Sequence, residues 1–310
     1  MNKSARCAAA ALGLFSSLNA GCGAEPDQSE NVASAHAALT ECNSGAPWWA
    51  RNGGSAKLMP VATHVCWLTR VAGRFDGSKS NSGVTVEGRS NDGFFWLVTR
   101  GAEEQGEAMC APKTCFLAGD GTQDVVETSW NLNFSSIANA HNPNCSHSSM
   151  PAWGGDSATM INAFPCPGSD CGRTSGGGEQ VRIEQSNSRS VPSRIHSNDC
   201  ADEGGLGKII HGSAMSLRVA TPTRTVPVHF AGGWWSSGNA SVLMEYADTS
   251  ICYLDLVQGK FRGGGEAVRL SREIEASTGR PRWRLSTSRG SASDHVQGEA
   301  SCFWFWQWDV

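Results

Sequence analysis

The middle of the chain carries histidine and cysteine side chains, which are residue types that bind transition metals in proteins. They are His141, Cys145, His147, His196 and His211. The closely spaced trio from His141 to His147 matches no compact zinc pattern, and no two cysteines of the chain are separated by two residues. We therefore expect these histidines to lie in loops in contact with water, and we expect neither a metal nor another cofactor.

Two glutamates could act as acid and base in glycoside hydrolysis if both faced one substrate. Glu107 and Glu299 occupy matched places in two similar stretches of the chain. Because each belongs to its own copy, we expect solvated residues near a turn rather than a catalytic pair. The aspartates expected in loops do not have the Asp-x-Asp-x-Asp-Gly spacing of a calcium loop. These are Asp120, Asp124, Asp156, Asp170, Asp199 and Asp202.

A glycine-rich stretch from Cys171 through Ser175 to Gly177 resembles the Cys-x-x-Asp-Ser-Gly-Gly nucleophile loop of chymotrypsin-like proteases. Two features depart from that family. Thr174 stands in place of the aspartate, and His141 lies only 34 residues before Ser175, too near for the β-barrel that separates base from nucleophile. The stretch is therefore interpreted as a flexible turn, and we expect a binding protein rather than an enzyme. A secreted hydrolase with a site in the central region stays an alternative.

Tryptophan is in excess, with 12 residues against 2 tyrosines. Exposed indoles form flat platforms for sugar rings or for an apolar partner, although tryptophan also fills cores. The residues that we expect to contact a ligand are Trp48, Trp49, Trp234, Trp235, Trp304, Trp306 and Trp308. The last three alternate along one strand and so share a face. Polar side chains that could bind sugar hydroxyls beside the doublets are Arg51, Asn52, Ser236 and Asn239.

These residues lie in two stretches with the same order of residues, which indicates an internal duplication. The matched pairs are Trp48 and Trp234, Cys66 and Cys252, Phe75 and Phe261, Trp96 and Trp283, Gly106 and Gly298, and Cys110 and Cys302. The first three pairs are 186 residues apart, and the separation grows to 192 at the last pair. Such stepwise growth is typical of matched strands joined by hairpin loops of different length.

Both copies have the composition of β-strands, with β-branched and aromatic runs such as 65–71 and 94–99 that end at glycine turns. We predict a mostly β fold in which two homologous, disulfide-bracketed antiparallel repeats, sandwich-like in form, flank a loop-rich central region. Within that region we expect strands over 124–134, 180–184, 213–219 and 225–230. The sequence leaves open whether the central region is a separate domain or completes a sheet with the repeats.

The chain contains 12 cysteines, a density that favours an oxidising compartment. We predict the disulfides Cys66–Cys110 and Cys252–Cys302, because each pair brackets one copy. Closing loops of this length stabilises a fold by roughly 3–4 kcal/mol in the chain-entropy model. The sequence does not assign the partners of Cys42, Cys115, Cys145, Cys166, Cys171 and Cys200.

Residues 1–21 have the basic start and short apolar run of an export signal, too short to span a bilayer, which needs ~20 apolar residues. The following Cys22 resembles the lipidated cysteine of a bacterial lipobox, although Asn19 stands where leucine is usual. Simple cleavage of the signal is the competing interpretation. The predicted organisation is a signal at 1–21, a tether at 22–43, a first repeat at 44–112, a central region at 113–229 and a second repeat at 230–310.

The repeat pattern Cys-x-Leu, Gly-x-Phe, Trp and Gly-x-x-x-Cys resembles repeats in uncharacterised bacterial secreted proteins and lipoproteins, and this resemblance implies no activity. A net charge of −4 gives no reason to expect nucleic acid as a partner. We predict an exported binding or adhesion module, secreted or held in the periplasm or outer membrane, that binds a glycan or protein surface. It would contact a membrane only through a lipid on Cys22. A purely structural surface protein is a further alternative.

Overall fold

The computed structural model describes residues 42, 47–75, 82–116, 127–131, 147–149, 157–166, 179–184, 194–198, 213–218, 230–259, 261–291 and 296–304. These residues form antiparallel strands and one short 3-10 helix, η1 (Lys113–Phe116). The prediction of a mostly β, disulfide-containing fold is therefore confirmed. No helix in the described part of the chain is long and apolar enough to cross a membrane.

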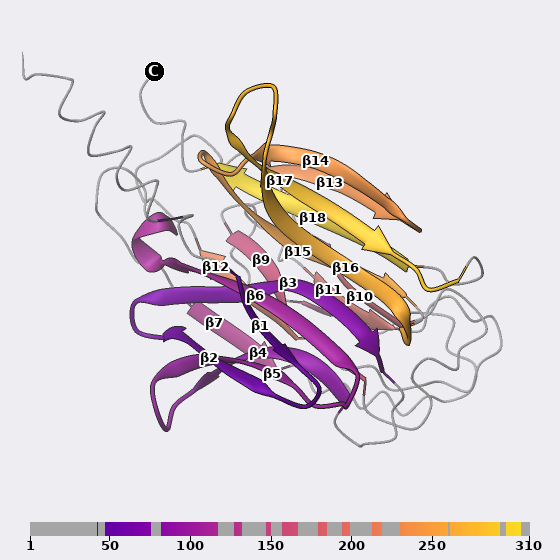
Figure 1. Ribbon diagram of the computed structural model, residues 1–310. Coiled ribbons are helices and arrows are strands. Elements are labelled where there is room, and N and C mark those ends of the chain that lie inside the picture. The colour runs from indigo at the N-terminus through magenta and orange to yellow at the C-terminus, as the bar shows by residue number, and fades with distance from the viewer. Residues whose placement is uncertain are drawn as a thin grey trace, which may run out of the picture.

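The strands form three sheets of six strands each, which we name sheets A, B and C. In spatial order, sheet A contains β1 (Trp48–Arg51), β6 (Glu104–Pro112), β3 (His64–Arg74), β16 (Arg262–Ile274), β17 (Pro281–Ser288) and β14 (Ala240–Tyr246). Figure 1 shows how its first three strands, from the beginning of the chain, lie beside three strands from the end, with β3 next to β16.

Sheets B and C are built in the same way from segments that are distant in the sequence. Sheet B contains β2 (Ser55–Pro60), β5 (Phe94–Thr99), β4 (Ser82–Arg89), β9 (Ser157–Cys166), β12 (Ser213–Arg218) and β7 (Glu127–Asn131). Sheet C contains β13 (Phe230–Ser237), β18 (Val296–Trp304), β15 (Ser250–Gly259), β10 (Glu179–Glu184), β11 (Arg194–Asn198) and β8 (His147–Ser149). The central region therefore completes two sheets with strands from both ends of the chain.

One rule of strand order holds three times along the chain. Six strands each come from the first segment (β1–β6), the central segment (β7–β12) and the last segment (β13–β18). In every segment the first, sixth and third strands form half of one sheet, and the second, fifth and fourth form half of another. The described strands thus have a threefold topology, in which the central segment corresponds to the other two.

The register of the strands supports this correspondence. The third and sixth strands of each segment pair across a β-bulge beside an alanine, which is Ala108, Ala214 or Ala300. The first strand of each segment places a tryptophan directly opposite that alanine: Trp48, Trp130 and Trp234 respectively. A bulge that recurs in the same place indicates that the three segments follow one backbone plan.

The structure contains both disulfides predicted from the sequence. Cys66 and Cys110 lie directly opposite each other in β3 and β6, and Cys252 and Cys302 do so in β15 and β18. The Cα atoms of each pair are 4.0 Å apart. This is just below the usual disulfide span of ~4.4–6.8 Å, and directly opposed residues of antiparallel strands also lie close together, at ~4.5 Å in a non-hydrogen-bonded pair. A third disulfide joins Cys42 to Cys115 in η1.

The core lies where the third strands of the three segments, β3, β9 and β15, contact one another. Phe75 and Phe261, which follow β3 and β15, meet edge to face with ring centroids 5.2 Å apart. The backbone N–H of Phe75 donates to the carbonyl of Phe261 at 3.0 Å. The buried indole of Trp67 donates to the Cys252 carbonyl at 3.2 Å. The first and last segments therefore share one core.

Two matched glycines allow the two halves of a segment to pack closely. A Cβ atom on Gly106 of β6 would lie 2.3 Å from Val84 in β4, and one on Gly298 of β18 would lie 2.6 Å from Val268 in β16. No side chain fits at such distances, so both glycines face the inner layer. The residue after each glycine therefore belongs to the opposite, outer face of its sheet.

The sequence match of Trp96 with Trp283 is wrong by one residue. Trp283 alternates with the buried residues Leu285 and Thr287, whereas the buried series in β5 starts at Phe95. A slip of one residue in a strand moves a side chain to the other face. Trp96 is accordingly half-exposed, and its indole donates to Asp92 at 2.9 Å. Desolvation raises the pKa of Asp92, but hydrogen bonds from Phe94 and Trp96 and the nearby charge of Lys57 outweigh this effect and hold the pKa below its usual value.

Candidate functional site

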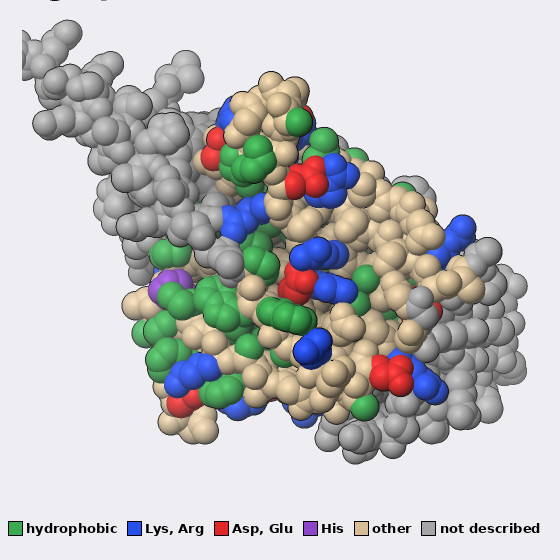
Figure 2. Space-filling model, viewed as in Figure 1, with side chains coloured by type: hydrophobic (Ala, Val, Ile, Leu, Met, Phe, Trp, Pro, Cys, Tyr) green, Lys and Arg blue, Asp and Glu red, His purple; other side chains and the backbone are tan. Residues whose placement is uncertain are grey.

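Four strands of sheet A present a row of directly opposed residues on its outer face. In spatial order these are Trp49 (β1), Glu107 (β6), Arg70 (β3) and Arg269 (β16), and we call them the outer row of sheet A. The bulge in β3 creates this row, because the register shift between Leu68 and Arg70 brings Arg70 opposite Glu107. Figure 2 shows basic and acidic side chains together on this face, with hydrophobic side chains beside them.

The charges of the outer row form one network around Glu107. Arg70 Nη1 donates to Glu107 Oε1 at 3.0 Å, and Arg269 Nε donates to Oε2 at 3.0 Å. Arg70 Nη2 also donates to the side-chain oxygen of Gln105 at 3.1 Å. Removing Glu107 would leave both arginines without their counterion at partly buried positions. The network therefore holds both guanidinium groups in place.

The expectation of a solvated glutamate near a turn is wrong for Glu107. Only 6% of this residue is exposed, and it lies within β6, which begins at Glu104. In the structure the neighbouring Gly106 faces inward, and the two arginines that cover the carboxylate come from other strands.

The first tryptophan doublet is divided between the core and the solvent. Trp48 is half-buried and packs against the core, whereas Trp49 is 58% exposed. The guanidinium of Arg51, two residues along the same face of β1, lies 5.2 Å from the centre of the Trp49 ring. Trp49 is therefore a flat apolar surface with a cation over the ring and the outer-row charges on the neighbouring strands.

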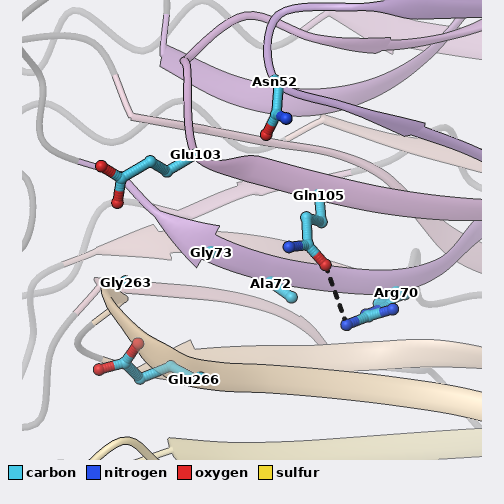
Figure 3. A pocket seen from close by; sticks show the side chains of 9 residues that line it. Asn52, Arg70, Ala72, Gly73, Glu103, Gln105, Gly263 and Glu266 are labelled. Carbon is cyan, nitrogen blue, oxygen red and sulfur yellow. Dashed lines mark hydrogen bonds between the residues drawn. The ribbon is translucent and has the colours of Figure 1, made fainter.

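A polar hollow of about 290 Å³ adjoins this surface, between the end of β3 and the starts of β6 and β16. Its lining includes Asn52, Arg70, Glu103, Gln105 and Glu266, together with glycines of β3 and β16. Figure 3 shows Glu103 and Glu266 on either side of Gly263, with Gln105 and Arg70 hydrogen-bonded further along the sheet. Amide, carboxylate and guanidinium groups of this kind can together donate to and accept from hydroxyl groups.

Of the other residues predicted to bind a ligand, three lie in described strands and two do not. Trp234, Trp235 and Trp304 lie in strands β13 and β18, opposite Ala300, Glu299 and Ser250 respectively. Trp306 and Trp308 lie outside the described residues, as do Cys22, His141 and Ser175.

Of the four polar residues expected beside the tryptophan doublets, two lie at the candidate site and two make structural contacts. Asn52 lines the hollow and Arg51 stacks on Trp49, as expected for polar residues at the rim of a binding surface. Ser236 cannot bind a ligand, because it is buried and its hydroxyl is 2.9 Å from that of Thr287. Asn239 is exposed, and its side-chain oxygen accepts from the backbone N–H of Arg289 at 2.8 Å, which stabilises a turn.

The metal candidates are only partly described. The expectation that these histidines lie in loops is wrong for His147 and His196, because strands β8 and β11 place them directly opposite each other. Cys145 and His211 lie outside the described residues. Within the described residues, no three histidine, cysteine or acidic side chains gather closely enough to hold a metal ion.

Sequence reasoning missed Arg70, Gln105 and Arg269. The signal available for the two arginines was a single charged residue in each of the apolar stretches 65–71 and 267–270. That signal does not tell which strands are neighbours, and Arg269 comes from a segment almost 200 residues after Arg70.

No protein-family model, curated protein sequence or solved structure significantly matches this chain. The described residues form a disulfide-bonded fold of three antiparallel sheets, and sheet A has an aromatic and charged outer face.

Proposed function

We propose that this protein is an exported binding module that recognises glycans through the outer face of sheet A. The observation that carries the proposal is the exposed indole of Trp49 beside Arg51, the outer-row charges and the polar hollow. Sugar rings have apolar C–H faces that stack on an indole and hydroxyl groups that need several hydrogen-bond partners. A flat aromatic surface next to a hollow lined by amides and charges meets both needs.

The rigidity of the site also supports this proposal. Trp49, Glu107, Arg70 and Arg269 all lie on strands, and the arginines are fixed through Glu107. Side chains that are already held in place lose little conformational entropy when a ligand binds, which favours affinity for weakly bound sugars.

Export is the cellular context that we propose for this function. The disulfides are consistent with an oxidising, extracellular environment. The signal at 1–21 would direct the chain out of the cytoplasm, and a lipid on Cys22 would hold the body near an envelope surface through the tether at 22–43. A module fixed in this way would bind cell-wall or host-surface glycans.

Replacing Trp49 by alanine tests the function. Screening the purified protein on a printed array of defined oligosaccharides should give at least one binder, which is then used in solution titrations. We expect Trp49→Ala to weaken binding at the outer face of sheet A by about tenfold to a hundredfold, because the stacking surface is lost. The melting temperature should change little, since substitutions at exposed positions usually alter stability by less than ~0.5 kcal/mol.

Trp48→Ala is the matched control. This neighbouring indole packs against the core, so its removal should lower the melting temperature measurably. A Trp49→Ala protein that keeps both the affinity and the stoichiometry of wild type, or a full array without a binder, would reject the glycan site and leave a structural surface protein as the better account.

A further inference from the structure

Sheet C repeats the residue pattern of the outer row of sheet A. Its strands β13, β18, β15 and β10 stand in the order that β1, β6, β3 and β16 have in sheet A. Their directly opposed residues are, in that order, Trp235, Glu299, Leu256 and Arg182. Tryptophan, glutamate and the outer arginine thus recur at the same register positions, and a leucine replaces Arg70.

Neighbouring residues place these positions on the outer face of sheet C. Gly298 faces the inner layer, because a Cβ there would lie 2.6 Å from Val268 and 3.4 Å from Leu285. Glu299 follows it and is half-exposed. Ser236 also faces inward, toward Thr287. Since successive strand residues alternate between faces, positions 235 and 299 both belong to the outer face.

We infer that sheet C carries a second glycan site, centred on Trp235, so that one chain binds two glycans. This inference rests on the proposed function of sheet A and extends it to a site that the first and last segments cannot build alone, because Arg182 comes from the central segment. Two sites on one chain raise the retention on a dense glycan surface by far more than either site alone.

Sheet B shows why the number of sites is two rather than three. Its corresponding residues, from β7, β12, β9 and β4, are Asn131, Ser213, Ala163 and Thr85. This row has neither an aromatic residue nor a charge, so it provides no stacking surface for a sugar. It supplies a control position that the topology makes equivalent to Trp49 and Trp235.

The two sites differ in charge. Leu256 is buried and stands where sheet A has Arg70, so sheet C lacks the arginine pair that flanks Glu107. Beyond Arg182 the row of sheet C continues to His196 and His147, whereas the row of sheet A continues to Ser286 and Ser241. We therefore expect the two sites to bind the same oligosaccharide with different affinities.

Titration of the full chain with the strongest array oligosaccharide tests this inference through the stoichiometry. Wild type should bind two equivalents, Trp49→Ala and Trp235→Ala one each, and the double variant none. Asn131→Ala, at the matched position of sheet B, should still bind two. If Trp235→Ala does not fold, as circular dichroism would show, Arg182→Ala replaces it and should weaken one of the two equivalents.

The outcomes separate the two proposals. One equivalent that disappears in Trp49→Ala and is unaffected by Trp235→Ala overturns the second site and leaves the first. A full array without any binder overturns both. Tryptophan oxidation without any sugar gives an independent check: Trp235 should be modified at a rate near that of Trp49, and resistance of Trp235 in the folded protein would overturn the second site.

Discussion

Replacing Phe75 or Phe261 by alanine is expected to destabilise the protein by about 3–5 kcal/mol. Both side chains are 1% exposed, and their rings meet edge to face at 5.2 Å. Each is therefore a large apolar group at the place where the first and last segments join, and its removal leaves a cavity that the surrounding strands cannot fill. Urea unfolding followed by circular dichroism gives the change in free energy of unfolding.

A double-mutant cycle makes this test specific. Because the two rings contact each other, the effects of Phe75→Ala and Phe261→Ala should not be additive, and the coupling should exceed ~0.5 kcal/mol. Ile274→Ala is the surface control, since Ile274 is 66% exposed and its truncation should change stability by less than ~0.5 kcal/mol. Additive losses would show that the two residues do not pack together.

The second large effect is expected from Gly106→Ala. The new methyl group would overlap Val84 at 2.3 Å and press on Leu97 at 3.3 Å, so the two halves of the first segment would have to separate. Overpacking of this kind costs typically ~1–3 kcal/mol. We expect a value at the upper end, measured by urea unfolding, because the overlap lies between two strands that cannot move independently.

Compensation at Val84 distinguishes overpacking from a general effect of alanine. Val84→Ala removes the methyl group nearest to Gly106, so adding it to Gly106→Ala should recover part of the lost stability. Gly88→Ala provides the matched control within the adjoining β4, because its nearest neighbour is a side-chain atom of Val61 at 3.3 Å and the residue is exposed. A Gly106→Ala protein as stable as wild type would contradict the close packing.

The sequence predicted the structure correctly where the same cysteine and phenylalanine residues recur in both copies. Cys66 and Cys110 bracket a copy in the same way as Cys252 and Cys302, and both pairs are bridged. Phe75 and Phe261 stand in the same local motif, and both are buried. The expected strands over 180–184 and 213–219 also agree closely with β10 and β12. The duplication as an event of descent stays a prediction.

The third unit escaped sequence analysis because its landmarks are missing. At the register positions of the two disulfides, the central segment pairs Thr159 with Ser216. Trp130 was the remaining signal, since it occupies the position of Trp48 and Trp234. One tryptophan without a cysteine framework does not indicate a repeat, and hydrogen bonding between distant strands leaves no mark in the local sequence.

The candidate site could be predicted only in part for a similar reason. Trp49 was identified from its doublet, but Glu107 was assigned to solvent, and Arg70 was not considered. The bulge at Thr69 moves Arg70 to the face opposite to that expected from simple alternation, and Arg269 arrives from the last segment. A binding surface that spans two segments depends on strand pairing, which residue patterns alone do not specify.

Oxidative footprinting tests most directly whether a glycan binds on the outer face of sheet A. The purified protein is oxidised at its tryptophans with and without a saturating array oligosaccharide, and peptide mapping gives the extent at each residue. Trp49 should be modified readily in the free protein and protected in the complex, while the half-exposed Trp96 on sheet B should react equally in both. A Trp49 that reacts at the same rate in the saturated complex would contradict the proposed site.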